Sequence, residues 1–397
     1  MPIFEEINQL HLIGIGGIGM SAIARFFLAK GKVVTGSDMN SSDLVQELIE
    51  EGAVITLGHG GLPEGTQAVI YSEAIPESNP ERMASDELPS FNYFEALGEI
   101  SKGYKVLAVA GTHGKTTTTA MLGYLLQEVG LDPTVIVGSK VPQFNGKNFR
   151  MGKSEWMVVE ACEYRRNFLP LRPEILGITN IELDHLDYFK DEEDYQAAFD
   201  EIEAQSKHVV SAIEYDGPVG VPGRHNRENA SLAAAMAEAI GVNDFSALGR
   251  FKGTWRRFQR RGDWNGAAVI DDYAHHPTEL TVTLETAREE FPGKNIVAVF
   301  QPHQHSRTAA FVDDFTKALL LADMVIIPNI YATRDTAEQK EAMSAEHFVA
   351  ELASEGVNIR LTGSLDLTAE LLNKTLSPND VLLVMGAGNV SDVIPKE

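Results

Sequence analysis

A glycine-rich segment in the middle of the chain, GTHGKTT at residues 111–117, has the residue types that bind a nucleoside triphosphate. It follows the apolar strand pattern VLAVA and precedes a helical pattern, so its backbone N–H groups can surround phosphate oxygens. Lys115 can reach the β- and γ-phosphates, and the Thr116 hydroxyl can bind Mg²⁺. Val109 stands where the full phosphate-loop pattern has its first glycine. We predict that the phosphates of a nucleoside triphosphate are bound by Gly111, Thr112, His113, Gly114, Lys115, Thr116 and Thr117.

Two later segments end in side chains that could hold the metal ion of such a loop. Glu160 closes the strand pattern WMVVEA, and His185 lies between Asp184 and Asp187 in NIELDHLD. The carboxyl ends of parallel strands meet at one edge of a sheet, so both segments could reach Mg²⁺ near the γ-phosphate. Histidine is an unusual ligand for Mg²⁺, which prefers oxygen. We predict a metal site formed by Thr116, Glu160 and His185.

A second glycine loop lies near the start of the chain, where GIGGIGM places Gly14, Gly16 and Gly19 between a strand pattern and a helical pattern. Glycine lets the backbone approach a diphosphate, and the helix N-terminus attracts negative charge. Asp38 ends the next strand pattern, where an acid that binds ribose would lie. The pattern by itself favours a nicotinamide dinucleotide, but a UDP-sugar diphosphate or a plain tight turn is also compatible with it.

Composition excludes several classes of protein. The 397 residues include 33 Lys and Arg against 57 Asp and Glu, a net charge of −24, which argues against a general binder of nucleic acid or anionic lipid. No apolar run is long enough for a membrane span, and the first residues lack the basic region of a signal peptide. Cys162 is the single cysteine, which fits a reducing cytoplasm.

Short apolar runs alternate with longer helical patterns, which predicts an α/β fold with largely parallel sheets. We expect three domains, at residues 1–100, 101–262 and 263–397. A helix is expected over 226–241 and a buried strand over 175–185, whereas 75–90 has the composition of a loop. Monomer and homodimer are both compatible with the sequence.

Seven motifs occur in one order along the chain: AGTHGKTTT, the VEA strand, TNIELDHLD, PGRHNRENA, GTWRRF, DDYAHHPTE and FQPHQHSRT. Together with the N-terminal GIGGIGMS, they resemble the Mur ligases over nearly the whole chain. The resemblance implies a Rossmann-like N-terminal domain for a UDP-sugar, a central phosphate-loop domain for ATP, and a Rossmann-like C-terminal domain for an amino acid. It therefore replaces NAD by a UDP diphosphate at the first glycine loop.

The activity that the resemblance implies is ATP- and Mg²⁺-dependent joining of L-alanine to UDP-N-acetylmuramate through an acyl phosphate, in peptidoglycan precursor synthesis. The alternative within the family is a recycling ligase that joins the tripeptide L-alanyl-γ-D-glutamyl-diaminopimelate to the same sugar. An NAD-dependent dehydrogenase or a P-loop ATPase would each explain one glycine loop and leave the other motifs without a role.

Site residues follow from the matching motifs. The resemblance implies UDP-sugar contacts at Gly14, Gly16, Gly17, Gly19, Ser21, Asp38 and Ser72. It implies further ATP contacts at Asn226, Asn229, Arg257 and Asp271 or Asp272. The amino-acid site would be lined by Tyr273, His275, His276 and Arg307. Lys115 would act in phosphoryl transfer, and His185 or His276 would be the base that deprotonates the amine.

The chain departs from the family pattern at three places. Gln304 stands where L-alanine ligases often have arginine, and EACEYRR at 160–166 resembles the recycling ligase. Only a short segment, 208–221, connects Lys207 to the PGRHN motif, where family members have a longer one. The central domain is therefore expected to be shortened.

Overall fold

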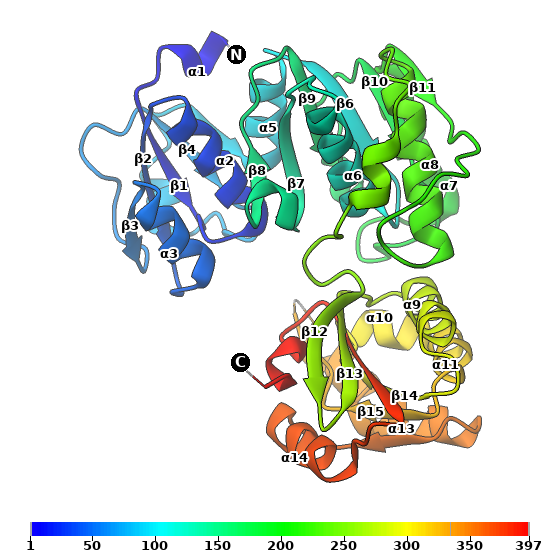
Figure 1. Ribbon diagram of the computed structural model, residues 1–397. Helices are drawn as coiled ribbons and strands as arrows, with labels where there is room; N and C mark the ends of the chain where they lie inside the picture. Colours follow the sequence, from blue (N-terminus) through cyan, green and yellow to red (C-terminus); the bar gives the residue numbers. More distant parts are fainter. Residues whose placement is uncertain (1, 334, 396–397) are drawn as a thin grey trace. The chain divides into compact units, whose positions relative to one another are not determined.

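The computed structural model describes residues 2–333 and 335–395, and in that part of the chain three α/β layers are each built on one sheet (Figure 1). The chain forms two compact units, Met1–Gly220 with Arg227–Thr254, and Val221–Asn226 with Trp255–Glu397. The first unit holds two sheets and the second holds one. This architecture confirms the predicted fold class, while the predicted boundaries at 100/101 and 262/263 stay predictions.

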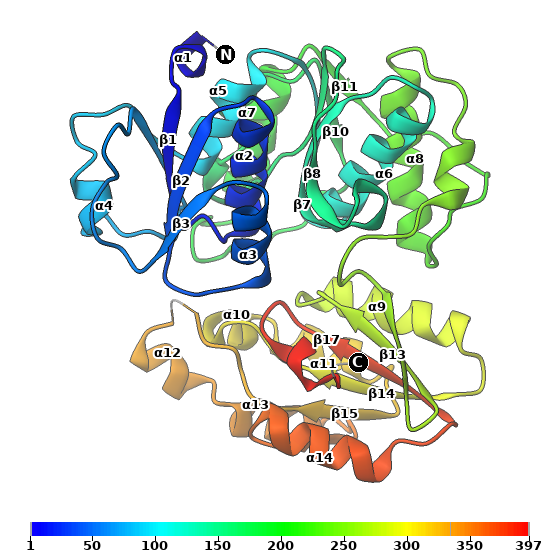
Figure 2. The ribbon, with the colours of Figure 1, turned by 60° about the vertical axis from the view of Figure 1, so that its left-hand side comes forward.

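The N-terminal sheet has five parallel strands in the order β3-β2-β1-β4-β5. Figure 2 shows β1, β2 and β3 side by side. Its strands are β1 (Gln9–Ile13), β2 (Val33–Asp38), β3 (Val54–Leu57), β4 (Ala68–Tyr71) and β5 (Ser90–Asn92). Its helices are α1 (Pro2–Glu5), α2 (Ile18–Ala29), α3 (Asp43–Glu50), α4 (Pro80–Met83) and α5 (Tyr93–Ser101). Because β1 lies in the middle, the glycine loop that follows it emerges where the strand order reverses, the usual ligand position in such sheets.

The second sheet has six strands in the order β11-β10-β6-β9-β7-β8, parallel except for the β7–β8 pair. Its strands are β6 (Lys105–Ala110), β7 (Thr134–Val141), β8 (Lys147–Arg150), β9 (Trp156–Glu160), β10 (Ile175–Ile178) and β11 (His208–Val210). The helices of this layer are α6 (Lys115–Glu128), α7 (Glu192–Ala204) and α8 (Arg224–Glu238), with short 3₁₀ turns η1 (Pro142–Phe144), η2 (Tyr164–Arg166) and η3 (Ser246–Arg250). The loop before α6 follows β6, and β6 pairs in parallel with β9. The loop therefore lies beside the carboxyl end of β9.

The first two sheets share one hydrophobic core, which explains why they form one unit. Phe26 of α2 lies with its ring centroid 6.4 Å from that of Tyr104 and 6.4 Å from that of Phe149 in β8. Helix α2 contacts both β7 and β8 of the second sheet as well as β2 of its own (Figure 1). Burial of large aromatic side chains is a dominant stabilising contribution, so the glycine loop is fixed relative to the second sheet.

The second unit holds a six-stranded sheet in the order β12-β13-β17-β14-β15-β16, parallel except for the β12–β13 pair. Its strands are β12 (Gln259–Trp264), β13 (Ala267–Asp272), β14 (Asn295–Phe300), β15 (Met324–Ile327), β16 (Ile359–Leu361) and β17 (Asp380–Met385). Its helices are α9 (Pro277–Glu290), α10 (His305–Ala310), α11 (Val312–Leu319), α12 (Ala337–Ala342), α13 (Ala345–Ser354) and α14 (Leu365–Thr375), with the 3₁₀ turn η4 (Val390–Val393). Apolar clusters cover both faces of the sheet.

Three element predictions differ in detail from the structure. The strand expected over 175–185 ends at Ile178, because the following residues turn to hydrogen-bond the phosphate loop. The segment 75–90 contains the short helix α4, which the Asn79 side chain caps by accepting from the N–H groups of Glu81 and Arg82. The helix expected over 226–241 runs from Arg224 to Glu238.

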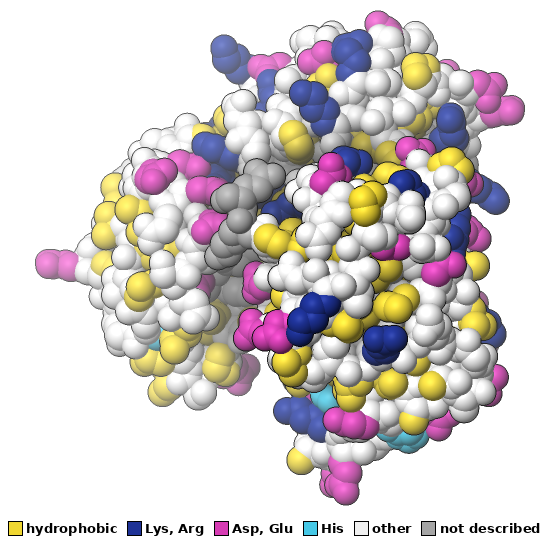
Figure 3. Space-filling model, turned by 60° about the horizontal axis from the view of Figure 1, so that its bottom comes forward, with side chains coloured by type: hydrophobic (Ala, Val, Ile, Leu, Met, Phe, Trp, Pro, Cys, Tyr) yellow, Lys and Arg dark blue, Asp and Glu magenta, His cyan; other side chains and the backbone are white. Residues whose placement is uncertain are grey.

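Acidic and basic side chains both lie on the surface of the protein. On the face that Figure 3 shows, acidic and basic side chains of the described residues are interspersed with hydrophobic ones. None of the helices in the described part of the chain is long and apolar enough to cross a membrane.

Candidate functional site

The phosphate loop between β6 and α6 depends on glycine at two positions. Gly111 and Gly114 have φ angles of 129° and 85°, which disfavour other residues. A Cβ atom at Gly111 would lie 2.0 Å from Thr179 Oγ1, and one at Gly114 would lie 2.3 Å from Asn229 Oδ1. Gly114 is also the N-cap of α6 and provides no side chain to cap the first turn. The loop therefore presents the amino end of a 14-residue helix, which suits a phosphate group.

Lys115 is held in its charged form by a buried carboxylate. Its Nζ lies 2.8 Å from Glu163 Oε2 and donates hydrogen bonds to the carbonyls of Gly111 and Thr112, at 2.6 and 2.9 Å. Burial by itself would lower the pKa of Lys115, but the charge and hydrogen bond of Glu163, together with the other acidic groups nearby, outweigh burial and raise this pKa. Burial likewise opposes ionisation of Glu163, yet Lys115 and His185 hold its pKa below the usual value.

Glu163 is a residue of this site that the predicted metal and ATP residues did not include. Its carboxylate bridges Lys115 and His185, whose Nε2 lies 3.3 Å from Glu163 Oε1. The His185 ring also packs against Tyr164, with centroids 4.6 Å apart. The signal in the sequence is the spacing of Glu163 three residues after Glu160, just past a buried strand.

Glu160, at the end of β9, joins two neighbouring elements. Its Oε1 accepts a hydrogen bond of 2.8 Å from the Thr116 hydroxyl, and its Oε2 accepts one of 2.8 Å from the Gly138 N–H. A carboxylate and a hydroxyl side by side form an oxygen donor set of the kind that Mg²⁺ prefers. The structure thus brings Thr116 and Glu160 together, as predicted, while His185 contacts Glu163 instead.

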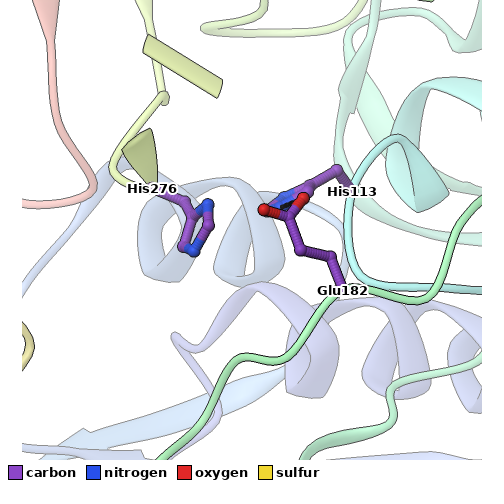
Figure 4. Close-up of side chains that lie close together, drawn as sticks. All are labelled: His113, Glu182 and His276. Carbon is purple, nitrogen blue, oxygen red and sulfur yellow. Dashed lines mark ion pairs between the residues drawn. The ribbon is translucent and has the colours of Figure 1, made fainter. Parts of the chain in front are cut away.

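The segment that follows β10 holds the phosphate loop in place. Asn180 Oδ1 accepts from the His113 N–H at 3.0 Å, and the Thr112 hydroxyl donates to the Glu182 carbonyl at 2.8 Å. The His113 ring Nε2 lies 3.3 Å from Glu182 Oε2 (Figure 4). Figure 4 also draws His276, which belongs to the second unit and is described below. These contacts explain why residues 179–182 leave the sheet.

The N-terminal glycine loop is shaped by close approaches of its backbone. A Cβ atom at Gly16 would lie 2.8 Å from Val45, and one at Gly19 would lie 2.8 Å from the Tyr93 ring. Gly14 has a φ angle of 76°. A Cβ atom at Gly17 would lie no closer than 3.4 Å to its nearest neighbour, so space does not require glycine there.

A cavity of about 320 Å³ connects this loop to the phosphate-loop side of the first unit. One end is lined by Gly17 and Ser72 and the other by Glu160 and Cys162, with Tyr93 also in its wall. Tyr93 was not predicted from the sequence, because its position depends on the packing of α5. Burial, and then the charge of Glu160, raises the pKa of its hydroxyl, which therefore stays protonated. The cavity therefore extends from the N-terminal glycine loop to Glu160, which contacts Thr116 in the first turn of α6.

Cys162 lies in the same cavity wall but is not a reactive thiolate. Burial raises the pKa of its thiol to about 12, and the Glu163 charge adds to this effect. The thiol is therefore neutral at physiological pH and a poor nucleophile.

The three predicted UDP-sugar residues that are not glycines, Ser21, Asp38 and Ser72, have different surroundings. Ser72 lines the cavity. Asp38 Oδ2 accepts a hydrogen bond of 2.9 Å from the Gly16 N–H, which places the carboxylate against the loop backbone. Ser21 is fully buried, and its hydroxyl donates to the Ile18 carbonyl and accepts from Asn148 Nδ2. Ser21 is thus placed to hold helix α2 and not to line the cavity.

Helix α8 carries the two asparagines predicted on the adenine side, three positions apart in the sequence. Asn229 is buried with its Oδ1 against Gly114, which brings it to the phosphate loop. Asn226 donates a hydrogen bond of 2.6 Å from Nδ2 to the Pro222 carbonyl.

In the second unit, Asp271 and Asp272 are both buried but differ in their partners. Asp271 accepts from Arg256 Nε and Arg261 NH1, each at 2.9 Å, so both of its oxygens are engaged by arginine. Asp272 accepts from the N–H groups of Phe258 and Ala274, and burial raises its pKa to about 6. Of the two, Asp271 has the surroundings of a structural ion pair.

The predicted amino-acid residues gather around Tyr273. Arg257 lies over the Tyr273 ring at 5.3 Å, the His275 ring lies 5.5 Å from it, and the charge of Arg307 contributes to its electrostatic environment. His276 differs, because it is 3% exposed and caps α9 by accepting the Thr278 N–H. Arg257 also pairs with Glu279 at 3.6 Å. The structure therefore groups Tyr273, His275, Arg257 and Arg307 within the second unit.

Comparison with known proteins identifies the class. Three family models match along the chain: the Mur ligase family catalytic domain over residues 9–105, the Mur ligase middle domain over 109–218, and the Mur ligase glutamate ligase domain over 256–388. The chain belongs to the Mur ligase family, in agreement with the resemblance seen in the motifs.

Individual relatives show which members of the family this chain is similar to. The chain is 36% identical to the UDP-N-acetylmuramate–L-alanine ligase of Caldanaerobacter subterraneus, with 98% of this chain and 97% of that protein covered. The solved structure of the UDP-N-acetylmuramate–alanine ligase MurC of Thermotoga maritima is 29% identical, with a TM-score of 0.82 and 97% of each chain covered. The murein peptide ligase of Psychrobacter arcticus is 24% identical with a TM-score of 0.71, a likeness of fold.

The comparison also shows that this chain is shorter than the Caldanaerobacter enzyme. The match to the Caldanaerobacter enzyme extends over 449 residues, whereas this chain has 397, so at least 52 of those positions have no counterpart here. Between β11 and α8, residues 211–223 form no helix or strand. This segment is where the sequence predicted a shortened domain.

Proposed function

We propose that the protein is an ATP-dependent ligase that joins L-alanine to UDP-N-acetylmuramate in the cytoplasmic synthesis of peptidoglycan precursors. The observation that carries the proposal is the cavity between Gly17 and Glu160 beside the phosphate loop. It offers a helix N-terminus for a diphosphate at one end and a phosphoryl-transfer site at the other. The names of relatives that match almost end to end support this substrate pair.

The first half-reaction would activate the sugar carboxylate. Its oxygen attacks the γ-phosphorus of ATP, ADP leaves, and an acyl phosphate forms. Phosphoryl transfer depends mainly on positioning and on neutralising charge on the transferred group. Lys115 supplies a fixed positive charge, and Glu163 keeps that charge in place. Thr116 and Glu160 would hold Mg²⁺, which would offset phosphate charge.

In the second half-reaction, the neutral amine of L-alanine attacks the acyl phosphate, and phosphate leaves as the amide forms. The amine must give up a proton to a base. His185 lies with Glu163 and Lys115, whereas the His276 ring accepts the Thr278 N–H as a helix cap. We therefore favour His185 as the base. Tyr273, His275 and Arg307 would bind the amino acid, with Arg307 facing its carboxylate.

The amino substrate can be tested by product analysis. With ATP, Mg²⁺ and UDP-N-acetylmuramate, we expect L-alanine to give the amide product and one ADP per product. The tripeptide L-alanyl-γ-D-glutamyl-diaminopimelate should give at least about 100-fold less product, because a site for a small amino acid does not accommodate the longer chain. Mass spectrometry of the UDP-linked product would measure both. Equal or faster reaction with the tripeptide would favour the recycling ligase, and ADP formation without a sugar substrate would favour a simple ATPase.

A further inference from the structure

A set of buried polar contacts joins helix α2 to the β7–β8 hairpin, and the residue at its centre is Asn148. This side chain is fully buried in β8. Its Oδ1 accepts a hydrogen bond of 2.6 Å from Arg25 NH1. Its Nδ2 donates to the Ile18 carbonyl and, at 3.1 Å, to the Ser21 hydroxyl. The oxygen and the NH₂ group of the Asn148 amide are therefore both hydrogen-bonded to residues of α2, a helix of the N-terminal sheet.

The partners on α2 place Asn148 next to the proposed diphosphate end of the cavity. Ile18 is the first residue of α2 and lines the cavity together with Gly17. The bond from Asn148 to the Ile18 carbonyl therefore holds the first turn of the helix directly behind the cavity wall. Because the first turn provides the backbone N–H groups, a small shift of this turn changes where an anion can bind.

Arg25 reinforces the same contact from the other side. It is 3% exposed, and its guanidinium pairs with Glu47 at 2.7 Å and with Glu51 at 3.0 Å. Lys140 of β7 pairs with Glu47 as well, and Lys140 and Arg25 together hold the pKa of Glu47 below its usual value although burial opposes this. The N–H groups of the buried Arg25 guanidinium are thus bonded to two carboxylates and to the Asn148 amide. These bonds hold the guanidinium in one orientation.

The hairpin also contacts the other end of the cavity. Gly138 of β7 donates its N–H to Glu160 Oε2, and Ile136, Val137 and Gly138 line the cavity wall. One short hairpin thus touches the first turn of α2 through Asn148 and the carboxylate of Glu160 through Gly138.

We infer that Asn148 is a positioning residue for the UDP-sugar: it holds the first turn of α2 at a fixed distance from Glu160, so that the sugar carboxylate reaches the γ-phosphate. This inference rests on the proposed function and goes beyond it, since Asn148 acts through α2 and not on the substrates. A misplacement of about 1 Å by a residue outside the reacting groups can cost about 100-fold in rate.

The test uses two substitutions that affect the amide differently. Asn148→Ala removes all three contacts. Asn148→Asp keeps an acceptor for Arg25 but removes the donor to Ile18 and Ser21. We expect both variants to raise the KM for UDP-N-acetylmuramate by about 10-fold or more and to lower kcat, while the KM for ATP stays within twofold. Lys153→Ala is the matched control, because Lys153 is exposed, follows β8 by three residues and lies outside the contacts of Asn148 and Arg25. It should leave both KM values within twofold.

Thermal melting and calorimetric titration separate the outcomes. A variant that melts like the wild type and still binds the UDP-sugar about 10-fold more weakly supports positioning. A folded Asn148→Asp with wild-type KM for the sugar would overturn the inference, as would equal increases in the KM values of ATP and sugar. Titration of the wild type with UDP-N-acetylmuramate comes first, because a wild type that does not bind it overturns the proposed function and this inference with it. If Asn148→Ala does not fold, Asn148→Asp and Ser21→Ala carry the test.

Discussion

Lys115→Ala is expected to lower kcat for product formation by about 10³-fold, which corresponds to roughly 4 kcal/mol of transition-state stabilisation. The reason is that Lys115 supplies a fixed cation at the phosphate loop, held by Glu163 at 2.8 Å and by two loop carbonyls. Steady-state release of ADP and of amide product would measure the loss. Near-normal turnover in this variant would contradict the assignment of Lys115.

A control must separate this loss from a loss of stability, because removing Lys115 takes away a cation that compensates the buried Glu163 carboxylate. An uncompensated buried charge is strongly destabilising. The double variant Lys115→Met with Glu163→Gln removes both charges, so it should recover melting temperature but not activity. Lys105→Ala, at the exposed start of β6, the strand that leads into the phosphate loop, should leave kcat unchanged.

Glu160→Gln is expected to lower kcat by about 10²-fold and to shift the Mg²⁺ dependence to higher concentrations. The substitution keeps the shape of the side chain but removes the negative charge beside the Thr116 hydroxyl, so an oxygen ligand for the metal is weakened. Initial rates over a range of Mg²⁺ concentrations would measure the shift.

The matched control is Glu155→Gln, one residue before β9, where the carboxylate is exposed and pairs with Lys105. It should give the wild-type Mg²⁺ curve. If Glu160→Gln gave that same curve with unchanged kcat, Glu160 would not be a metal ligand.

The parts of the site that the sequence predicted are those encoded by neighbouring residues. The loop GTHGKTT carries its glycines, lysine and threonine within seven positions, so local chemistry is enough to predict a phosphate loop. The structure then adds the reason for each glycine: at Gly111 and Gly114 any Cβ atom would collide with Thr179 or Asn229.

The parts that the sequence did not predict depend on contacts between distant segments. Ser21 and Asn148 are 127 positions apart, and no local pattern in either segment indicates that they meet. The β7–β8 hairpin that brings them together follows α6 with no strong strand alternation. Tyr93 likewise enters the cavity wall only because α5 packs beside the glycine loop. Tertiary packing decides such positions.

The net charge of the chain did not predict the charges at the site. The net charge of −24 excluded a general binder of polyanions, yet two of the proposed substrates are polyanions. Their binding relies on helix N-termini and on a few placed cations, such as Lys115 at the phosphate loop. Lys115 is paired with the buried Glu163 carboxylate and so does not contribute to a basic surface.

The most direct test of the proposed reaction follows oxygen from the sugar carboxylate. UDP-N-acetylmuramate labelled with ¹⁸O in its carboxylate would be converted with ATP, Mg²⁺ and L-alanine, and the released phosphate would be analysed by mass spectrometry. An acyl phosphate transfers one carboxylate oxygen to phosphate, so we predict one ¹⁸O in each phosphate released and one retained in the amide. Unlabelled phosphate accompanying amide formation would contradict activation of the carboxylate by phosphoryl transfer at this site.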